Sequence, residues 1–252
     1  KVFEQVRTGE RGWSQTRALG VILRVCEAMA FAHEKGVVHR DIKPANVMVG
    51  RFGETYVMDW GLAKVMGRED SHDLRLRDTA TALSLVRTDR RDAAHQTPDS
   101  PLVTMDGDIM GTPCYMPPEQ ARGNLEEIGP HSDVYSVGAL LYELLTGWRP
   151  YVEPGQKPSP QAVLTMLLHG PPRAIHAIDR NVPSELTAIC EKAMARRAEE
   201  RYPNMLAMAE DLRAFLEGRV VRAYETGPVA EFRKWSARNK CAAASAAAAL
   251  LL

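Results

Sequence analysis

The sequence predicts a mainly α-helical fold with one small β-hairpin beside its most polar loop. Apolar residues recur at intervals of three and four in several long segments, which indicates helices that each bury one face. Two short runs rich in Val, Thr, Tyr and Met, 47–49 and 55–58, flank glycines at positions 50 and 53 and predict the hairpin. These patterns favour a helical domain that carries a minor sheet.

The composition is that of an ordinary globular protein. The 252 residues are 45% hydrophobic and 25% charged, and 32 basic residues balance 32 acidic ones. A net charge of zero gives no indication of nucleic acid as a partner. The four cysteines are scattered without a C-x-x-C pair, which predicts small buried side chains in a reducing compartment.

The first helix is expected to lead directly into the polar loop. Residues 1–16 are polar and predict a lead-in loop. From Arg17 to Lys35 the apolar side chains share one helical face, and Gly36 supplies a stop at the C-terminal end. The chain begins with Lys rather than Met, so we expect a fragment or a processed product.

The polar loop holds an acid, a cation and an amide at fixed offsets. His39-Arg40-Asp41 is followed by Lys43 and Asn46, and the apolar run 47–49 comes next. If this run pairs with the second run of the hairpin, Asn46 is brought beside Asp59 at one end of the sheet. A lone His-Arg-Asp has little specificity, but the four residues Asp41, Lys43, Asn46 and Asp59 at this spacing are highly specific.

This constellation resembles the catalytic loop and metal-binding motif of protein kinases, and Lys43 before Pro is typical of the Ser/Thr-specific branch. The resemblance implies that Asp41 accepts the proton of the substrate hydroxyl and that Lys43 reaches the transferring phosphate. It also implies that Asn46 and Asp59 hold Mg²⁺, which prefers oxygen ligands. Met48 would lie beneath the adenine of ATP.

Two alternatives to an active protein kinase remain open. Asp59-Trp60-Gly61 resembles the Asp-Phe-Gly of the family, and the Trp in place of Phe favours a pseudokinase, a membrane-anchored binding or regulatory module. The other alternative is a small-molecule phosphotransferase, which can share the Asp and Asn pattern. Lys43 and the segment 112–119 favour protein substrates, and the intact metal ligands favour catalysis.

An insertion is expected after the metal-binding motif. Residues 67–108 are rich in Arg, Asp, Ser and Thr without sustained periodicity, and we expect them to be disordered and the first part cleaved by proteases. By resemblance they belong to the activation segment of a kinase. Among their hydroxyl residues Thr104 is the preferred phosphorylation site, because a phosphate there would pair with Arg40.

The stretch 111–119 resembles the kinase segment that receives the substrate residue after the phosphoacceptor. Thr112 would hydrogen-bond toward the catalytic loop, which suits a Ser or Thr acceptor. Glu119 is expected to form a buried ion pair with Arg201, a contact that is costly to break although it adds little net stability.

The remaining helices follow from their apolar patterns. Residues 131–146 are apolar around most of the circumference, which predicts a central buried helix. Its first turn carries Asp133, which resembles the family acid that holds the backbone of the catalytic loop and is also a favourable helix cap. Shorter helices are expected at 161–168, 184–195 and 204–216.

From Arg17 to Arg219 the chain resembles the C-terminal lobe of a bacterial serine/threonine protein kinase of the eukaryotic-like (Hanks) type. This implies an α+β family fold, ATP and Mg²⁺ as cofactors, protein Ser or Thr as acceptor, and autophosphorylation in trans. No G-x-G-x-x-G loop precedes Asp41, so we expect that the N-terminal lobe is missing. We therefore expect this fragment alone to bind ATP negligibly and to be inactive, whereas its parent protein is active.

The tail predicts a membrane attachment. Residues 220–240 include a basic stretch with an aromatic side chain and would form a juxtamembrane segment. Residues 241–252 carry no charge and are rich in Ala, which we interpret as the truncated start of a transmembrane helix, because a full span needs ~20 apolar residues. The basic flank would place the kinase lobe in the cytoplasm. The alternative is an Ala-rich helical tail or linker.

Overall fold

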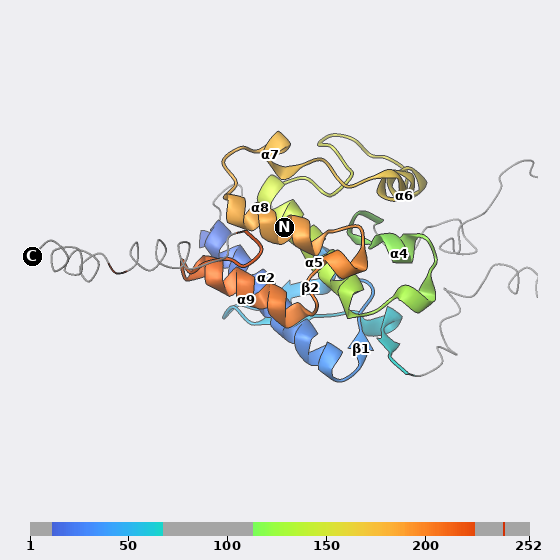
Figure 1. Cartoon of the computed structure of the whole chain (residues 1–252), viewed down its shortest axis with the longest axis horizontal. Helices are drawn as coiled ribbons and strands as arrows, with labels where there is room; N and C mark the ends of the chain where they lie inside the picture. Colours follow the sequence, from blue (N-terminus) through green and yellow to red (C-terminus); the bar gives the residue numbers. More distant parts are fainter. Residues whose placement is uncertain (1–11, 68–112, 225–238, 240–252) are drawn as a thin grey trace, which may run out of the picture.

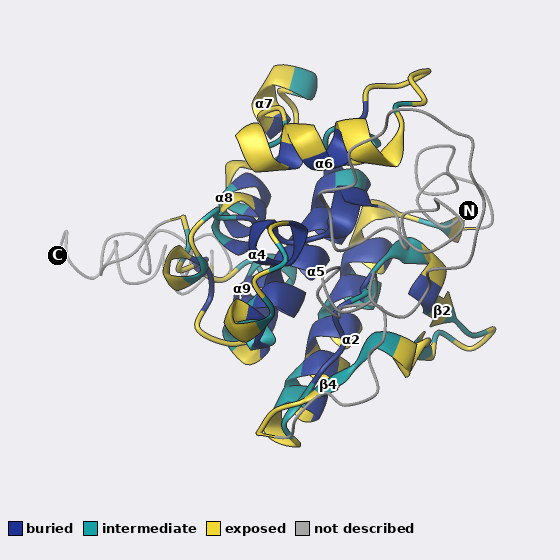
Figure 2. Cartoon of the chain, turned by 90° about the vertical axis from the view of Figure 1, so that its right-hand side faces the viewer, coloured by how far each residue is buried: buried dark blue, intermediate teal, exposed yellow. Residues whose placement is uncertain are grey.

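Four helices form the core of the domain, with α5 in contact with the other three. The computed structural model describes residues 12–67, 113–224 and 239. The four helices are α2 (Gln15–Glu34), α5 (Pro130–Thr146), α8 (Ser184–Ala193) and α9 (Met205–Leu216). In Figure 2 the buried residues gather along these helices, whereas α6 (Pro160–His169) and α7 (Ile175–Ile178) present much exposed surface. The predicted mainly helical fold is confirmed.

Helix α2 begins two residues before the predicted start. The side chain of Ser14 accepts a hydrogen bond from the backbone N–H of Arg17, and this cap fixes the first turn. Its apolar face, which includes Leu19, Ile22 and Met29, is buried against α9 and α5. The helix ends before Gly36, whose φ of 75° lies in the left-handed region that glycine enters without a steric penalty. The chain is thereby turned toward the polar loop.

Helix α5 is buried around most of its circumference, as its sequence predicts. Its buried residues run from Ser132 to Leu145 with a single interruption at Glu143. Gly138 lies where α5 meets α8, and a Cβ atom there would be 2.8 Å from the Cβ of Ala193 and 2.8 Å from the Cγ of Met194. The two helices therefore approach each other at a distance that only glycine permits.

Replacing Gly138 with Ala should destabilise the chain by about 1–3 kcal/mol, because the new methyl group forces α8 to move. Urea unfolding of the full chain measures this. Gly20→Ala is the matched control: Gly20 lies within α2 with nothing within 4 Å of its added Cβ, so helix propensity should stabilise the chain slightly. Equal unfolding midpoints for the two variants would contradict the close packing of α5 on α8.

The predicted hairpin is confirmed. Strand β2 (Val47–Val49) pairs antiparallel with β3 (Thr55–Val57), and Val47 lies opposite Val57. A second two-stranded sheet, β1 (Val37–Val38) with β4 (Lys64–Val65), was not predicted. Strand β1 precedes the polar loop and β4 follows the metal-binding motif. Their pairing therefore brings together the two ends of the segment that contains both.

Short elements connect the core to the site. Besides α6 and α7, these are α4 (Pro118–Ala121) and the 3₁₀ turns η2 (Pro44–Asn46), η3 (Trp60–Leu62), η4 (Pro113–Tyr115), η5 (Leu125–Glu127) and η6 (Ala198–Glu200). Proline is the first residue of α4, α5 and α6. The N–H of a first helical residue makes no hydrogen bond within the helix, so proline loses nothing by lacking it. Helix α7 was not predicted, because four residues are too few for a periodic pattern.

Several expectations concern residues outside the described part of the chain. These are the insertion beyond Gly67, Thr104, Thr112, most of the lead-in loop, and the membrane segment 241–252. Within the described residues, no helix combines the length and the apolar character that crossing a bilayer requires. Cys26, Cys114 and Cys190 are free and buried, as predicted.

Candidate active site

The hairpin register determines which polar residues meet. The backbone N–H of Met58 donates to the carbonyl of Asn46 over 2.8 Å, which extends the pairing of β2 with β3 by one residue. Asp59 therefore follows directly beside Asn46 at the end of the sheet. The turn η2 ends at Asn46, so the polar loop and the metal-binding motif meet at this point.

The Asp41 carboxylate is the centre of a small cluster. Its Oδ2 accepts hydrogen bonds from the Lys43 ammonium at 2.7 Å and from the Asn46 amide at 3.1 Å. The Asn46 amide also donates to the backbone carbonyl of Asp41 at 2.8 Å. The side chains of Asp41 and Lys43 remain 17% and 19% exposed, whereas Asn46 is buried. The carboxylate is thus oriented by two donors and stays accessible to a substrate group.

Asp59 has the backbone conformation of a tight turn. Its φ of 61° and ψ of 67° lie in the left-handed region, which Asp tolerates better than most residues. The residue is exposed at the end of β3. Such a conformation at a polar position is a feature that functional sites retain.

The donor set at this end of the sheet fits Mg²⁺. Because the Asn46 nitrogen donates to Asp41, the side-chain oxygen of Asn46 is left for a metal ion. Asp59 follows Met58, whose backbone N–H is bonded to the Asn46 carbonyl, so a second oxygen donor comes from the neighbouring strand end. In the described part of the chain, no three His, Cys, Asp or Glu side chains are grouped in a way that could hold a metal ion. Mg²⁺ is usually held by one or two carboxylates together with substrate phosphates, so this small set suits an ion that arrives with a nucleotide.

Asp133 holds the backbone of the polar loop. Its carboxylate is fully buried and accepts from the backbone N–H groups of His39 at 2.8 Å and Arg40 at 2.9 Å. Arg40 has a φ of 69°, a conformation that non-glycine residues rarely adopt without such support. The Nε2 of His33 lies 2.8 Å from the same carboxylate. Helix α5 therefore fixes the conformation of the residue before Asp41.

The Trp60 ring is 40% exposed and packs against the side chain of His39. Its centroid lies 4.6 Å from that of the His39 imidazole, with the planes tilted by 59°. The indole N–H donates to the Val57 carbonyl at 2.9 Å, and the His39 Nε2 lies 3.0 Å from the Met58 carbonyl. The Trp is thus accommodated by hydrogen bonds to the hairpin and a ring contact with the loop.

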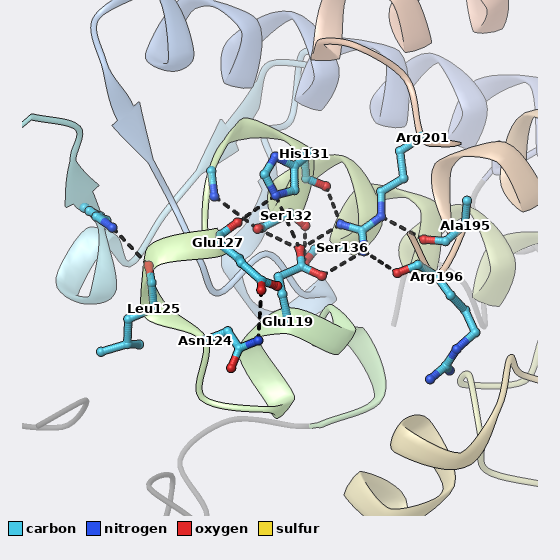
Figure 3. A network of polar contacts seen from close by, with 12 residues as sticks. Glu119, Asn124, Leu125, Glu127, His131, Ser132, Ser136, Ala195, Arg196 and Arg201 are labelled. Atoms are coloured by element: carbon cyan, nitrogen blue, oxygen red, sulfur yellow. Dashed lines mark hydrogen bonds and ion pairs between the residues drawn. The ribbon is translucent and has the colours of Figure 1, made fainter. Parts of the chain in front are cut away.

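Glu119 and Arg201 form a buried bidentate ion pair, shown in Figure 3. The Arg201 nitrogens Nη1 and Nη2 lie 2.7 and 2.8 Å from the two Glu119 carboxylate oxygens, and both side chains are almost fully buried. Ser132 also donates to the carboxylate at 2.8 Å. Burial acts to raise the pKa of Glu119, but the hydrogen bonds and charge of Arg201 hold it below its ordinary value. The pair joins α4 to the segment before α9.

The segment from Pro113 to Glu119 is tied to the loop and to α5. The Gln120 amide donates to the Arg40 carbonyl at 3.1 Å, which connects α4 with the polar loop. The Tyr115 hydroxyl donates to the Glu143 carboxylate at 2.5 Å, and burial raises the pKa values of both groups. Met48 lies on β2 and is 46% exposed, beside the hairpin partner Tyr56.

Sequence reasoning missed four residues of this region. They are His33, Ser132, Gln120 and Glu143, and each acts through a contact with a residue far away in the chain or on another element. Only Ser132 could have been found from the local sequence, because it lies in the third position of α5, where a capping side chain is expected. No comparable local pattern marks the other three.

Comparisons with known proteins agree with this geometry. The family model described as the protein kinase domain matches residues 2–212. A probable serine/threonine-protein kinase of Streptomyces coelicolor is 35% identical over 207 residues, which cover 82% of this chain and 25% of the relative. PknD of Protochlamydia amoebophila is 33% identical over 82% of this chain and 19% of the relative. For PknB of Mycolicibacterium smegmatis, the identity is 35% over 80% of this chain and 27% of the relative. The match thus spans about a quarter of these relatives' length.

Proposed function

This chain belongs to the protein kinase domain family, and from that premise we propose that the protein containing it is a bacterial serine/threonine kinase. It would transfer the γ-phosphate of ATP to a Ser or Thr hydroxyl of a protein. The proposal depends on one observation above all: the side chains of Lys43 and Asn46 both donate to the carboxylate of Asp41. Asn46 is in turn bonded to the strand that ends in front of Asp59. The similarity to relatives that are named serine/threonine-protein kinases supports it.

Each residue of the cluster has a task in this reaction. The Asp41 carboxylate would orient the substrate hydroxyl and accept its proton. Lys43, which donates to Asp41, would place its charge beside the transferring phosphate. Asn46 and Asp59 would hold Mg²⁺, which supplies positive charge to the phosphate oxygens when bound. The exposed Met48 would provide an apolar surface for the adenine ring.

The full-length protein should phosphorylate itself and added proteins on Ser or Thr. The assay combines it with labelled ATP and Mg²⁺ and identifies the labelled amino acids after acid hydrolysis. Removing the divalent cation with EDTA should abolish the label, because Asn46 and Asp59 alone offer the phosphates no positive charge. Label on phosphotyrosine, or on a small-molecule acceptor alone, would contradict the proposal. Mixing an inactive variant with the active protein tests autophosphorylation in trans.

We also propose that the protein is anchored to a membrane through the segment that begins at residue 241, with the kinase lobe on the cytoplasmic side. The uncharged composition of 241–252 and the basic residues before it support this. The full-length protein should sediment with membranes and resist extraction by high salt. Removal of the segment from 241 onward should release it. Recovery of the intact protein in the soluble fraction would contradict the anchor.

A further inference from the structure

A cavity of about 590 Å³ lies away from the Asp41 cluster, between the C-terminal part of α5, the loop after it and α6. Its walls include the aromatic side chains of Tyr142, Trp148 and Tyr151. None of the residues assigned to phosphoryl transfer above lines it. The volume is within the range of pockets that bind small organic molecules. The kinase reaction therefore leaves this cavity unexplained.

Two of the aromatic walls are held rigidly. Tyr151 has a φ of 67°, a left-handed conformation that is rare for a bulky residue. Its hydroxyl lies 2.9 Å from that of the buried Tyr135, and this contact supports the unusual backbone. The Tyr142 hydroxyl donates to the Arg173 carbonyl at 2.6 Å. A ligand would therefore meet surfaces that are already ordered, which lowers the entropic cost of binding.

The lining of the cavity has an excess of positive charge. Arg173 is already engaged, since its guanidinium lies 3.3 Å from the Glu153 carboxylate and 5.6 Å from the Trp148 ring centre. Arg149 also lines the cavity and is exposed, and no acid among the described residues forms an ion pair with it. The nearby Glu143 carboxylate is bonded instead to the Tyr115 hydroxyl.

From these features we propose that the cavity binds a small aromatic carboxylate. Its ring would lie against Trp148 and the tyrosine rings, and its carboxylate would pair with Arg149. Planar guanidinium groups bind carboxylates through two parallel hydrogen bonds, and aromatic walls favour a planar ring over an aliphatic chain. This ligand site is separate from the nucleotide site and does not depend on the kinase activity.

The test uses the 252-residue chain with 2-naphthoate as the probe and the neutral isostere 2-naphthamide beside it. Calorimetry should show saturable binding of one naphthoate per chain, and the amide should bind about tenfold more weakly because it lacks the charge. Arg149→Gln should weaken naphthoate binding to the level of the amide and leave amide binding unchanged. Equal affinity for the two probes, or no saturable binding, would overturn the proposal.

Two further variants make the result specific to this cavity. Arg197→Gln removes an exposed arginine remote from the lining and should leave naphthoate binding unchanged. Arg149→Lys keeps the charge without the planar fork and should lose less affinity than Arg149→Gln. If Arg149→Gln and Arg197→Gln behave alike, the carboxylate is not held by Arg149 and the proposal is wrong. Thermal unfolding of each variant verifies that all are folded. Competition between an acidic peptide and naphthoate would show that the cavity takes a protein segment instead, and would overturn the proposal.

Discussion

Phosphoryl transfer by the full-length protein should fall by about 10²–10⁴-fold when Asp41 is replaced by Asn, since that is the usual contribution of a positioned general base. The amide has nearly the shape of the carboxylate but cannot take up the hydroxyl proton. The substitution also removes the negative charge of the carboxylate, which accepts a hydrogen bond from the Lys43 ammonium at 2.7 Å. Initial rates at saturating ATP and Mg²⁺, with a Ser- or Thr-containing protein as acceptor, measure the loss.

Asp179→Asn is the matched control for this change. Asp179 follows α7 and accepts a hydrogen bond from the backbone N–H of Asn181, a bond that an Asn side chain can also accept. Its substitution should leave the rate unchanged. Full activity of the Asp41 variant would reject the assignment of Asp41 as the base. A raised KM for ATP with an unchanged kcat would do the same, because it would make Asp41 a binding group only.

The second large effect concerns stability. Replacing Arg201 with Met keeps most of the side-chain volume but removes the bidentate partner of the buried Glu119 carboxylate, which then has only the His131 Nε2 at 3.9 Å as a neighbouring basic group. Breaking one half of a buried ion pair typically costs about 3–5 kcal/mol, and urea unfolding of the chain should show a loss of this size. Arg197→Met, which removes a solvent-exposed arginine paired with Glu199, should be close to neutral. Similar losses in the two variants would contradict the special role of the buried pair.

The same ion pair predicts how the Arg201 effect depends on pH. The pKa of Glu119 in the folded chain is lowered from the ordinary value of 4.5. Its contribution to stability is therefore fully present above that value and is lost as the pH falls through the lower folded pKa. The stability difference between the natural chain and Arg201→Met should shrink as the pH falls below the ordinary value. A difference that grows on acidification would contradict this linkage.

Periodicity and spacing predicted the parts of this fold that depend on local sequence. The helices α2 and α5 have long apolar patterns, and the hairpin has two glycines between its strands, so each could be predicted within a few residues. The bond from the Met58 N–H to the Asn46 carbonyl, which brings the start of the metal-binding motif next to the polar loop, follows from the hairpin alone. The pairing of Glu119 with Arg201 was predicted from the family resemblance, because no local pattern links residues so far apart.

The remaining features depend on tertiary packing. Strands β1 and β4 have two residues each and carry no alternating pattern. The contact of His33 with Asp133 joins residues 100 positions apart, and the bond from Tyr115 to Glu143 forms only because η4 lies on α5. The left-handed Tyr151 has no glycine-like signature in the sequence. Such contacts become visible only when the helices are assembled.

The peptide units on both sides of Arg40 are held by hydrogen bonds. The Arg40 N–H is bound by the Asp133 carboxylate of α5, and its carbonyl accepts from Gln120 of α4. The residue that precedes the proposed base thus connects α5 in the core of the domain with α4, which follows the segment proposed to receive the acceptor protein. A displacement of α4 would therefore misalign the proposed base as well as weaken the proposed docking of the acceptor, so both would be lost together.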